Sequence, residues 1–386
     1  MDFSFTEEQE MWRKTMQDFT EKEAGREYTR MCDQEKRYPQ ELWEAGVRQG
    51  FPSLMIAPEY GGMGADAIMF AIFIECLAKY SYEMASIFSV PMFCAMNIAE
   101  NGTEEQRRRY LPPFCKGEQR FSISLTEPEA GSDAASISCS AKLEGDYLVI
   151  NGEKQFSTGA HLPNNIMHMA VKTDKEAVPK HKGISFVMVP NDLPGVQLTR
   201  LPLIARRAVG TCSIFLDNAK VPKENLIGEL NDGWRVITSH LELERMTVAA
   251  AVAGEGRSAL DDAVAYAVDR VQFGQQIIRW EAIGHRLAEL YAELEAARCL
   301  TYRVAWMITQ KTPCRDEVAM AKLLGTQVLE RISIAGMQTM GGYSLLDTTD
   351  FERHWRNARY LVIGGGASEI QRLILARTLG RHAGLR

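Results

Sequence analysis

The sequence predicts an α+β protein in which an antiparallel β domain lies between two helical domains. Apolar residues recur at the 3.6-residue spacing of helices up to about Gly117 and at the two-residue spacing of strands from Gln119. After Gly233 the helical spacing returns and continues to the end of the chain, and it includes one long apolar stripe formed by Ile283, Leu287, Leu290, Leu294 and Ala297. We therefore predict an N-terminal helical domain (1–118), a middle antiparallel β domain (119–228) and a C-terminal helical bundle (229–386).

The N-terminal segment begins with a helix-start signal. Thr6 is followed three residues later by Gln9, which predicts a capping box, and Trp12, Met16 and Phe19 then recur at helical spacing. The glycine-rich run 58–64 is expected to separate two helical stretches.

The middle segment has the alternation of half-buried strands. Residues 136–143 alternate strictly, Glu144-Gly145-Asp146 predicts a turn, and residues 147–150 form the next strand. We expect Asn151-Gly152 to close that strand as a hairpin turn. Further strands are predicted at 166–171, 184–189 and 212–216.

One acidic residue interrupts an apolar stripe in the C-terminal segment. Ile237, Leu241, Val248 and Val252 lie at helical spacing between residues 234 and 254, and Glu244 falls on the same face. Burial raises the pKa of a carboxyl group, and such a carboxylate can serve as a general base. Two alternatives remain: an ion pair with an arginine of a neighbouring helix, and a rotated helix that exposes Glu244.

Composition excludes several classes of function. The 386 residues carry 44 Lys plus Arg against 50 Asp plus Glu, without the basic surplus of a nucleic-acid binder. The longest apolar run, 67–74, is too short to span a membrane, and the N-terminus shows no signal peptide. Eight cysteines without a CxxC pair, and no HExxH, indicate a cytoplasmic protein with reduced thiols and no metal site.

Five sequence blocks together resemble the acyl-CoA dehydrogenase family, and their order and spacing also agree with it. The blocks are LTEPEAGSD (125–133), INGEKQFST (150–158), RVQFG (270–274), QTMGG (338–342) and SEIQR (368–372). The resemblance implies a C-terminal four-helix bundle, FAD at the junction of the domains, and a homotetramer. In that tetramer the bundle of one subunit contributes to the FAD site of its neighbour.

The resemblance also implies which residues hold FAD. The Leu125 amide and the Thr126 hydroxyl would bond the pyrimidine edge of the flavin, Thr158 would bond the N5 region, and Phe156 would cover the ring. Arg270 would pair with the pyrophosphate of the neighbouring subunit's FAD. The other implied cofactor contacts are Ser157, Gln272, Phe273, Glu281, Gln338, Gly341, Gly342, Ala367 and Glu369.

The catalytic position departs from the commonest family pattern. Many relatives carry a catalytic glutamate just before the last block, where this chain has Gly365 within Gly364-Gly365-Gly366. The isovaleryl and long-chain branch instead carries the acid directly before an arginine, which Glu244-Arg245 matches. The apolar stripe and the resemblance thus both indicate Glu244 as the base. Ser132, Glu242, Arg245 and Gly365 are the implied substrate contacts.

The resemblance implies α,β-dehydrogenation of an acyl-CoA thioester. Glu244 would remove the α-proton, a hydride would pass to flavin N5, and electrons would continue to an electron-transferring flavoprotein. The alternatives are an enoyl-CoA reductase working in the reverse direction, as in crotonobetainyl-CoA reductase-like relatives, a carrier-protein-bound substrate, and a catalytically silent flavin-binding homologue. The three glycines leave room for a bulky acyl group, but the sequence does not identify that group.

Overall fold

The structure is a computed structural model that describes residues 4–383. Its residues group into two compact units. The bundle unit comprises Met1–Met31, Asp66–Ala85 and Glu242–Arg386, and the sheet unit comprises Cys32–Ala65 and Ser86–Leu241. In chain order the elements are helical up to Cys115, mostly strands from Arg120 to Ile227, and helical again from Gly233, as predicted.

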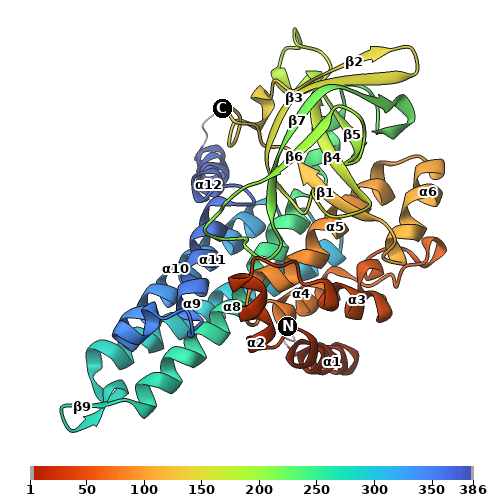
Figure 1. Cartoon of the computed structure of the whole chain (residues 1–386). Coiled ribbons are helices and arrows are strands. Elements are labelled where there is room, and N and C mark those ends of the chain that lie inside the picture. Colours follow the sequence, from red (N-terminus) through yellow and green to blue (C-terminus); the bar gives the residue numbers. More distant parts are fainter. Residues whose placement is uncertain (1–3, 384–386) are drawn as a thin grey trace. The chain divides into compact units, whose positions relative to one another are not determined.

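The bundle unit is built on three long helices, and Figure 1 shows the β9 hairpin at their far end. Leu287, Leu290 and Leu294 of the predicted stripe are buried between these helices. The Thr6 and Gln9 capping box is confirmed, with N···O distances of 3.1 and 3.2 Å. The helices are α1 (Glu7–Glu23), α2 (Arg26–Gln34, which continues into the sheet unit), α4 (Ala67–Leu77), α8 (Leu241–Asp269), α9 (Glu281–Thr309), α10 (Arg315–Met340), α11 (Phe351–Ile363) and α12 (Ser368–His382).

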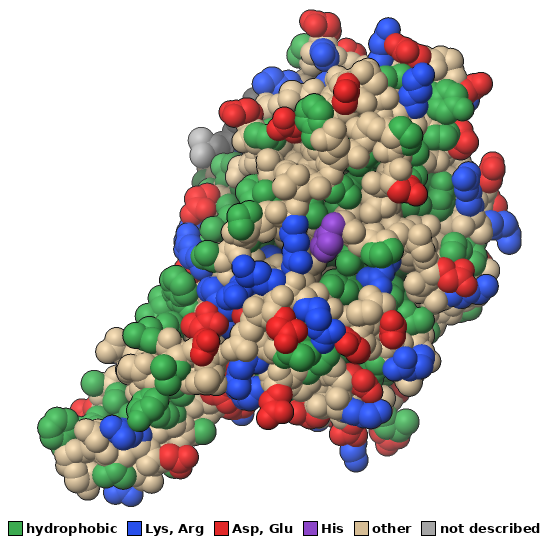
Figure 2. Space-filling model, viewed as in Figure 1, with side chains coloured by type: hydrophobic (Ala, Val, Ile, Leu, Met, Phe, Trp, Pro, Cys, Tyr) green, Lys and Arg blue, Asp and Glu red, His purple; other side chains and the backbone are tan. Residues whose placement is uncertain are grey.

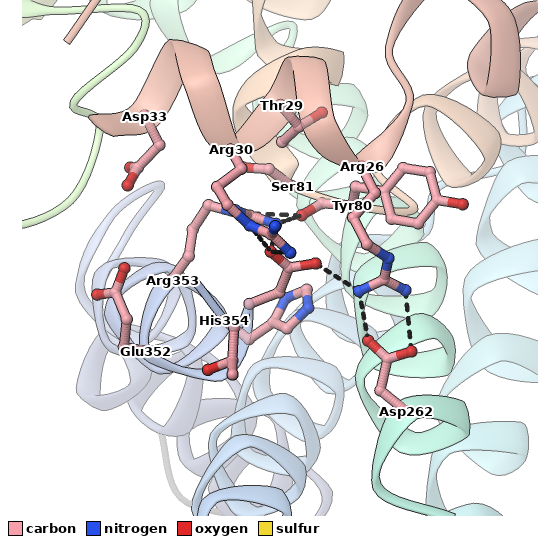
Figure 3. Close-up of polar contacts among 12 residues, drawn as sticks. Arg26, Thr29, Arg30, Asp33, Tyr80, Ser81, Asp262, Glu352, Arg353 and His354 are labelled. Carbon is pink, nitrogen blue, oxygen red and sulfur yellow. Dashed lines mark hydrogen bonds and ion pairs between the residues drawn. The ribbon is translucent and has the colours of Figure 1, made fainter. Parts of the chain in front are cut away.

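A partly buried cluster of charges, centred on the buried Asp350, connects α2, α8 and the start of α11. Arg26 donates two hydrogen bonds to Asp262, at 2.7 and 2.9 Å (Figure 3), and also pairs with Asp350. Arg30 and Arg353 reach the same Asp350 carboxylate at 3.1 and 3.0 Å. Because the Asp350 side chain is almost fully buried, these three guanidinium groups stabilise its ionised form.

The sheet unit contains one eight-stranded sheet and several helices. The strands are β1 (Arg120–Ser124), β2 (Ser140–Glu144), β3 (Tyr147–Thr158), β4 (Asn165–Lys172), β5 (Ile184–Pro190), β6 (Val196–Arg200), β7 (Thr211–Pro222) and β8 (Leu226–Ile227). They lie in the order β6-β7-β3-β2-β4-β5-β8, with β1 paired to β4. The helices are α3 (Gln40–Arg48), α5 (Tyr82–Asn101, which begins in the bundle unit), α6 (Glu104–Cys115) and α7 (Gly233–Thr238).

Most neighbouring strands are antiparallel, as predicted, but β1 runs parallel to β4 with Phe121 opposite Ile166. The expected hairpin turn at Asn151-Gly152 is wrong. β3 continues through both residues, and the pairing with β7 shifts register there. Gly152 has a φ of 139°, so the glycine serves a bulge inside a long strand instead of a turn.

The helix expected from 234 to 254 is interrupted between α7 and α8. Thr238 Oγ1 and Ser239 Oγ donate to the backbone carbonyls of Trp234 and Val236, and such bonds compete with continuation of a helix. Ile237, on α7, therefore does not share one continuous stripe with Leu241 and Val248, which both lie on α8. None of the helices within residues 4–383 combines the length and the apolar character that crossing a membrane requires.

Candidate active site

The segment that follows β1 presents hydrogen-bond donors without partners. Leu125 and Thr126 are half-buried, and the described chain provides no acceptor for the Leu125 amide or the Thr126 hydroxyl. The Thr126 carbonyl accepts from the Gln155 amide at 2.8 Å, which holds this segment against β3. Donors that are fixed but unsatisfied suit a ligand rich in carbonyl and ring-nitrogen acceptors, such as a flavin.

Phe156 occupies a bulge in β3 and is exposed. The pairing of β3 with β7 shifts register between Lys154 and Ser157, and Phe156 lies within that shift with a φ of 61°. Its side chain is 57% exposed. A bulky residue with positive φ is uncommon, and an exposed phenyl ring beside unsatisfied donors fits a planar aromatic ligand.

The neighbouring hydroxyl groups differ in availability. Ser157 is fully buried and its Oγ donates to Ser124 Oγ at 2.9 Å, so its side chain is occupied inside the unit. Thr158 is half-buried, with its Oγ1 3.3 Å from Thr211 Oγ1. Ser132 is exposed in the loop before β2. Of these three residues, only Ser157 is fully buried, so the side chains of Thr158 and Ser132 are the more accessible ones.

A buried ion pair joins the segment after β1 to strand β3. The sequence analysis did not predict this pair. Lys154 Nζ lies 2.7 Å from Glu127 Oε1 and also donates to the Leu125 carbonyl at 3.2 Å. Glu127 further accepts from the backbone amides of Ser138 and Cys139. Burial opposes ionisation of Glu127, but Lys154 and these amides lower its pKa below the ordinary value. Through Lys154, the segment 125–127 that follows β1 is therefore attached to β3, the strand that carries Phe156.

In the bundle unit, four predicted cofactor residues line one pocket of about 570 Å³. They are Arg270, Gln272, Gly341 and Gly342. A Cβ atom added at Gly341 or Gly342 would meet no atom within 4 Å, so the glycines leave the space beside Arg270 open. The Arg270 side chain forms no ion pair within the described chain. An unpaired guanidinium beside open glycine backbone fits a pyrophosphate.

Other predicted cofactor residues lie outside that pocket lining. Gln338 is exposed on α10, and Glu281 is exposed at the start of α9. Phe273 is 92% exposed at the tip of the hairpin formed by β9 (Val271–Gln272) and β10 (Gln275–Gln276). Ala367 caps the N-terminus of α12, where Glu369 pairs with Arg372 at 2.9 Å.

Glu244 and the glycine loop 364–366 converge in the bundle unit. A Cβ atom added at Gly365 would lie 3.8 Å from Glu244 Oε1 and 3.5 Å from Val248 Cγ2. Glu244 therefore reaches the space that a side chain at position 365 would enter. Burial raises the pKa of Glu244, and the nearby charges of Arg245 and Lys322 oppose that rise only in part.

The other polar groups near Glu244 have few partners. Arg245 is 9% exposed, and its buried Nε has no hydrogen-bond partner in the described residues. Glu242 accepts from Cys314 Sγ at 3.4 Å. Lys322 is fully buried on α10 and donates to the Gly366 carbonyl at 2.8 Å. The sequence analysis did not predict a role for Lys322. A single lysine does not follow the hydrophobic periodicity of a helix, and its acceptor, the Gly366 carbonyl, lies far away in the sequence.

Among residues 4–383, no group of three or more His, Cys, Asp or Glu side chains is placed to hold a metal ion. In the sheet unit the unsatisfied groups are amide and hydroxyl donors, and in the bundle unit they are a guanidinium group and one carboxyl of raised pKa. Groups of these kinds can bind an organic phosphate or exchange a proton.

Models of one protein family match almost the whole chain. The N-terminal domain of acyl-CoA dehydrogenase matches residues 6–118, the middle domain matches 122–219, and the C-terminal domain matches 231–380. The three matches follow the order of the predicted domains.

Individual relatives match almost the full length of this chain. A probable acyl-CoA dehydrogenase, YngJ, from Bacillus subtilis is 35% identical, over 98% of this chain and all of the relative. The caffeyl-CoA reductase-Etf complex subunit CarC from Acetobacterium woodii is 33% identical, over 97% and 99% of the two chains. The structure of butyryl-CoA dehydrogenase from Megasphaera elsdenii superposes with a TM-score of 0.92 at 30% identity, covering 98% and 100%.

Proposed function

Since this chain belongs to the acyl-CoA dehydrogenase family, a family of FAD-dependent oxidoreductases, we propose that it oxidises or reduces the α,β-bond of an acyl-CoA thioester with Glu244 as the acid–base residue. The observation that carries this proposal is the convergence of Glu244 on Gly365. The carboxyl group of Glu244 reaches the same space as a side chain at position 365, where many relatives carry their base.

Glu244 is suited to exchange a proton with carbon. Its half-buried position raises its pKa, which makes the carboxylate a stronger base than an exposed glutamate. The α-proton of a thioester is weakly acidic, so its removal also requires polarisation of the thioester carbonyl. The backbone of the glycine loop 364–366 lies beside Glu244 and offers amide donors for that carbonyl.

The residues that would hold FAD fall into two sets. In the sheet unit, the Leu125 amide, the Thr126 hydroxyl and the Phe156 ring suit the isoalloxazine, and in the bundle unit Arg270 and the Gly341-Gly342 turn suit the pyrophosphate. When bound, FAD supplies the acceptor or donor of the hydride. Phe156 would also exclude water from the ring that it covers.

Both directions of the reaction remain candidates. The matched relatives include a probable dehydrogenase and a reductase that belongs to an Etf complex. The same carboxyl group can remove the α-proton in oxidation and return it in reduction, so Glu244 serves either direction. We propose an electron-transferring flavoprotein as the electron partner, by analogy with that reductase complex.

We further propose a homotetramer. Large apolar side chains are exposed at the hairpin end of the bundle unit, including Phe273 at 92%, Leu345 at 73% and Tyr343 at 58%. Figure 2 shows apolar side chains gathered over the long helices at this end. Contiguous exposed apolar surface is typical of protein interfaces, and the pocket beside Arg270 opens in the same region.

Anaerobic titration of the purified, FAD-loaded protein with a panel of acyl-CoA thioesters tests the proposed function. Bleaching of the oxidised flavin absorbance by at least one thioester is expected, and reoxidation by the matching enoyl-CoA would establish the reverse direction. A protein that retains FAD, yet whose flavin responds to no acyl-CoA or enoyl-CoA, would instead be the silent homologue. The flavin midpoint potential with ligand bound would indicate the physiological direction.

A further inference from the structure

The glycine loop beside Glu244 is held from one side by two buried donors. Lys322 Nζ and Gln371 Nε2 both donate to the Gly366 carbonyl oxygen, at 2.8 and 2.9 Å. Both side chains are fully buried, one on α10 and the other on α12. Two donors from different helices thus share one acceptor.

The loop itself supplies little rigidity. Gly365 and Gly366 have φ values of 62° and 86°, a region that glycine enters without strain. Three consecutive glycines also have no side chains that could anchor the loop by packing. Its position relative to Glu244 therefore depends on contacts made to its backbone, and the Gly366 carbonyl provides the best-supported contact.

Lys322 occupies a costly position. It is fully buried, and no carboxylate lies within ion-pair distance of its Nζ in the described chain. Burial and the charge of Arg245 lower the pKa of Lys322 to about 8, while Glu244 and Glu369 act in the opposite direction. A methionine would fill the same space without this cost, so the ammonium group itself needs an explanation.

We propose that Lys322 is a positioning residue for the proton transfer: with Gln371 it clamps the Gly366 carbonyl, which fixes the glycine loop against the Glu244 carboxyl, and its charge favours the ionised form of that carboxyl. This inference rests on the proposed function, in which Glu244 exchanges the α-proton. It adds two roles for one buried cation, one geometric and one electrostatic.

Variants at the two donors separate these roles. K322M removes one hydrogen bond and the charge, Q371M removes only the other hydrogen bond, and K322R keeps a charge with altered geometry. Both methionine variants should slow flavin reduction by the wild type's best acyl-CoA about 10- to 100-fold, the loss that corresponds to one charge-assisted or buried hydrogen bond. K14M on the exposed face of α1 is the matched control.

The pH profile distinguishes the clamp from general damage. The charged groups nearest Glu244 are Arg245 on its own helix and Lys322 on α10, with Glu369 of α12 next to Lys322. K322M should move the midpoint of the reduction rate to higher pH, since Glu244 loses a cation that favours its carboxylate, whereas Q371M and K322R should leave the midpoint unchanged.

The outcomes can be assigned separately to each proposal. If no thioester reduces the wild-type flavin, the proposed function fails. If the wild type is reduced but FAD-loaded K322M matches it in rate and pH midpoint, the clamp is overturned. If K322M does not fold, a wild-type reduction rate in folded Q371M also overturns the clamp. FAD content and melting temperature are measured for every variant.

Discussion

Lys154 Nζ and Glu127 Oε1 lie 2.7 Å apart, and their side chains are 0% and 3% exposed. This buried pair joins the segment after β1, which carries Leu125 and Thr126, to the strand that carries Phe156. The three predicted flavin contacts of the sheet unit therefore share one internal brace. Their relative positions depend on an interaction that does not itself face the ligand.

We expect K154M to lower both stability and FAD content. Removing the lysine leaves the Glu127 carboxylate buried without its counter-charge, which typically costs about 3–5 kcal/mol. The Leu125 carbonyl also loses a donor, so its segment should shift. Melting temperature and the ratio of flavin to protein absorbance measure the two effects, and a K154M protein with full FAD occupancy would contradict the brace.

A double variant tests whether the charge imbalance causes the loss. In K154M/E127Q no unpaired charge remains, and the single carboxamide oxygen at position 127 can still accept from one of the two backbone amides, Ser138 or Cys139, that bond the two oxygens of Glu127. The double variant should therefore be more stable than K154M alone. Equal melting temperatures for the single and double variants would show that packing, not charge, dominates.

R270A should weaken FAD retention more than it alters the chemistry. The Arg270 guanidinium lines the pocket with the Gly341-Gly342 turn and has no protein partner in the described residues. Its loss should therefore weaken the binding free energy of FAD by about 1.5–3 kcal/mol, the contribution of a charge-assisted contact to phosphate. Dialysis of the holoenzyme followed by flavin quantification provides the measurement. R279A, an exposed arginine that does not line the pocket, is the control.

The assembly has its own test. If Arg270 serves the FAD of a neighbouring subunit, the FAD-loaded protein should sediment as a tetramer with one FAD per subunit. The exposed Phe273 side chain at the hairpin tip would be covered in that assembly. A strictly monomeric holoenzyme that retains FAD would rule out the cross-subunit role.

Local signals in the sequence anticipated the fold where the deciding interactions are short-range. The Thr6 and Gln9 capping box and the stripe through Leu290 depend on residues a few positions apart, and both are present as predicted. The prediction of a hairpin turn at Asn151-Gly152 was wrong, because an Asn-Gly pair is compatible with a β-bulge as well as with a hairpin turn. Which of the two forms depends on pairing with β7, which is distant in the sequence.

For the candidate site, the sequence led to one spatial relationship that can be compared with the structure. The resemblance indicated Glu244 and Gly365 as alternative sites for one acid, and the structure brings these two positions together. Lys154 and Lys322 were missed, because a buried lysine follows no periodicity and its acceptor lies on another element. Interactions of this kind become visible only when the chain is folded.

The charge cluster around Asp350 predicts a pH-dependent contribution to stability. Burial opposes ionisation of Asp350, but Arg353, His354, Arg26 and Arg30 lower its pKa below the ordinary value. A lowered folded-state pKa gives stability that is present above the unfolded-state pKa near ~3.9 and is lost as pH falls through the folded value.

D350N should accordingly unfold at a lower temperature than the wild type at pH 7, with a cost of about 3–5 kcal/mol, because Arg30 and Arg353 lose their carboxylate partner while Arg26 keeps Asp262. The difference between the two proteins should begin to shrink as the pH falls below the unfolded-state pKa of about 4, and it should disappear below the lowered folded-state pKa, where the carboxyl of the folded wild type is protonated too. D18N on exposed α1 controls for the amide itself. A difference independent of pH would point to packing instead of charge.

The last prediction concerns the base. E244Q should keep its fold and still bind FAD and acyl-CoA, since amide and carboxyl groups are nearly isosteric. Its rate of flavin reduction should fall by ~10²–10⁴-fold, because a positioned base contributes that much to the rate. Burial raises the pKa of Glu244, so the wild-type rate should increase with pH through a midpoint above the ~4.3 of an exposed glutamate. Only the ionised carboxyl accepts a proton, and E244Q should lack this midpoint.

Stopped-flow reduction across pH, with E289Q on the exposed face of α9 as control, measures both effects. A Gly365→Glu change in the E244Q background places an acid within reach of the same space, because the Cβ of residue 365 would lie 3.8 Å from the native carboxyl oxygen. The cost is a side chain at a φ of 62°, which favours glycine, so only partial recovery is expected. Near-normal flavin reduction by the single E244Q variant, on a substrate that the wild type turns over, would remove Glu244 as the base.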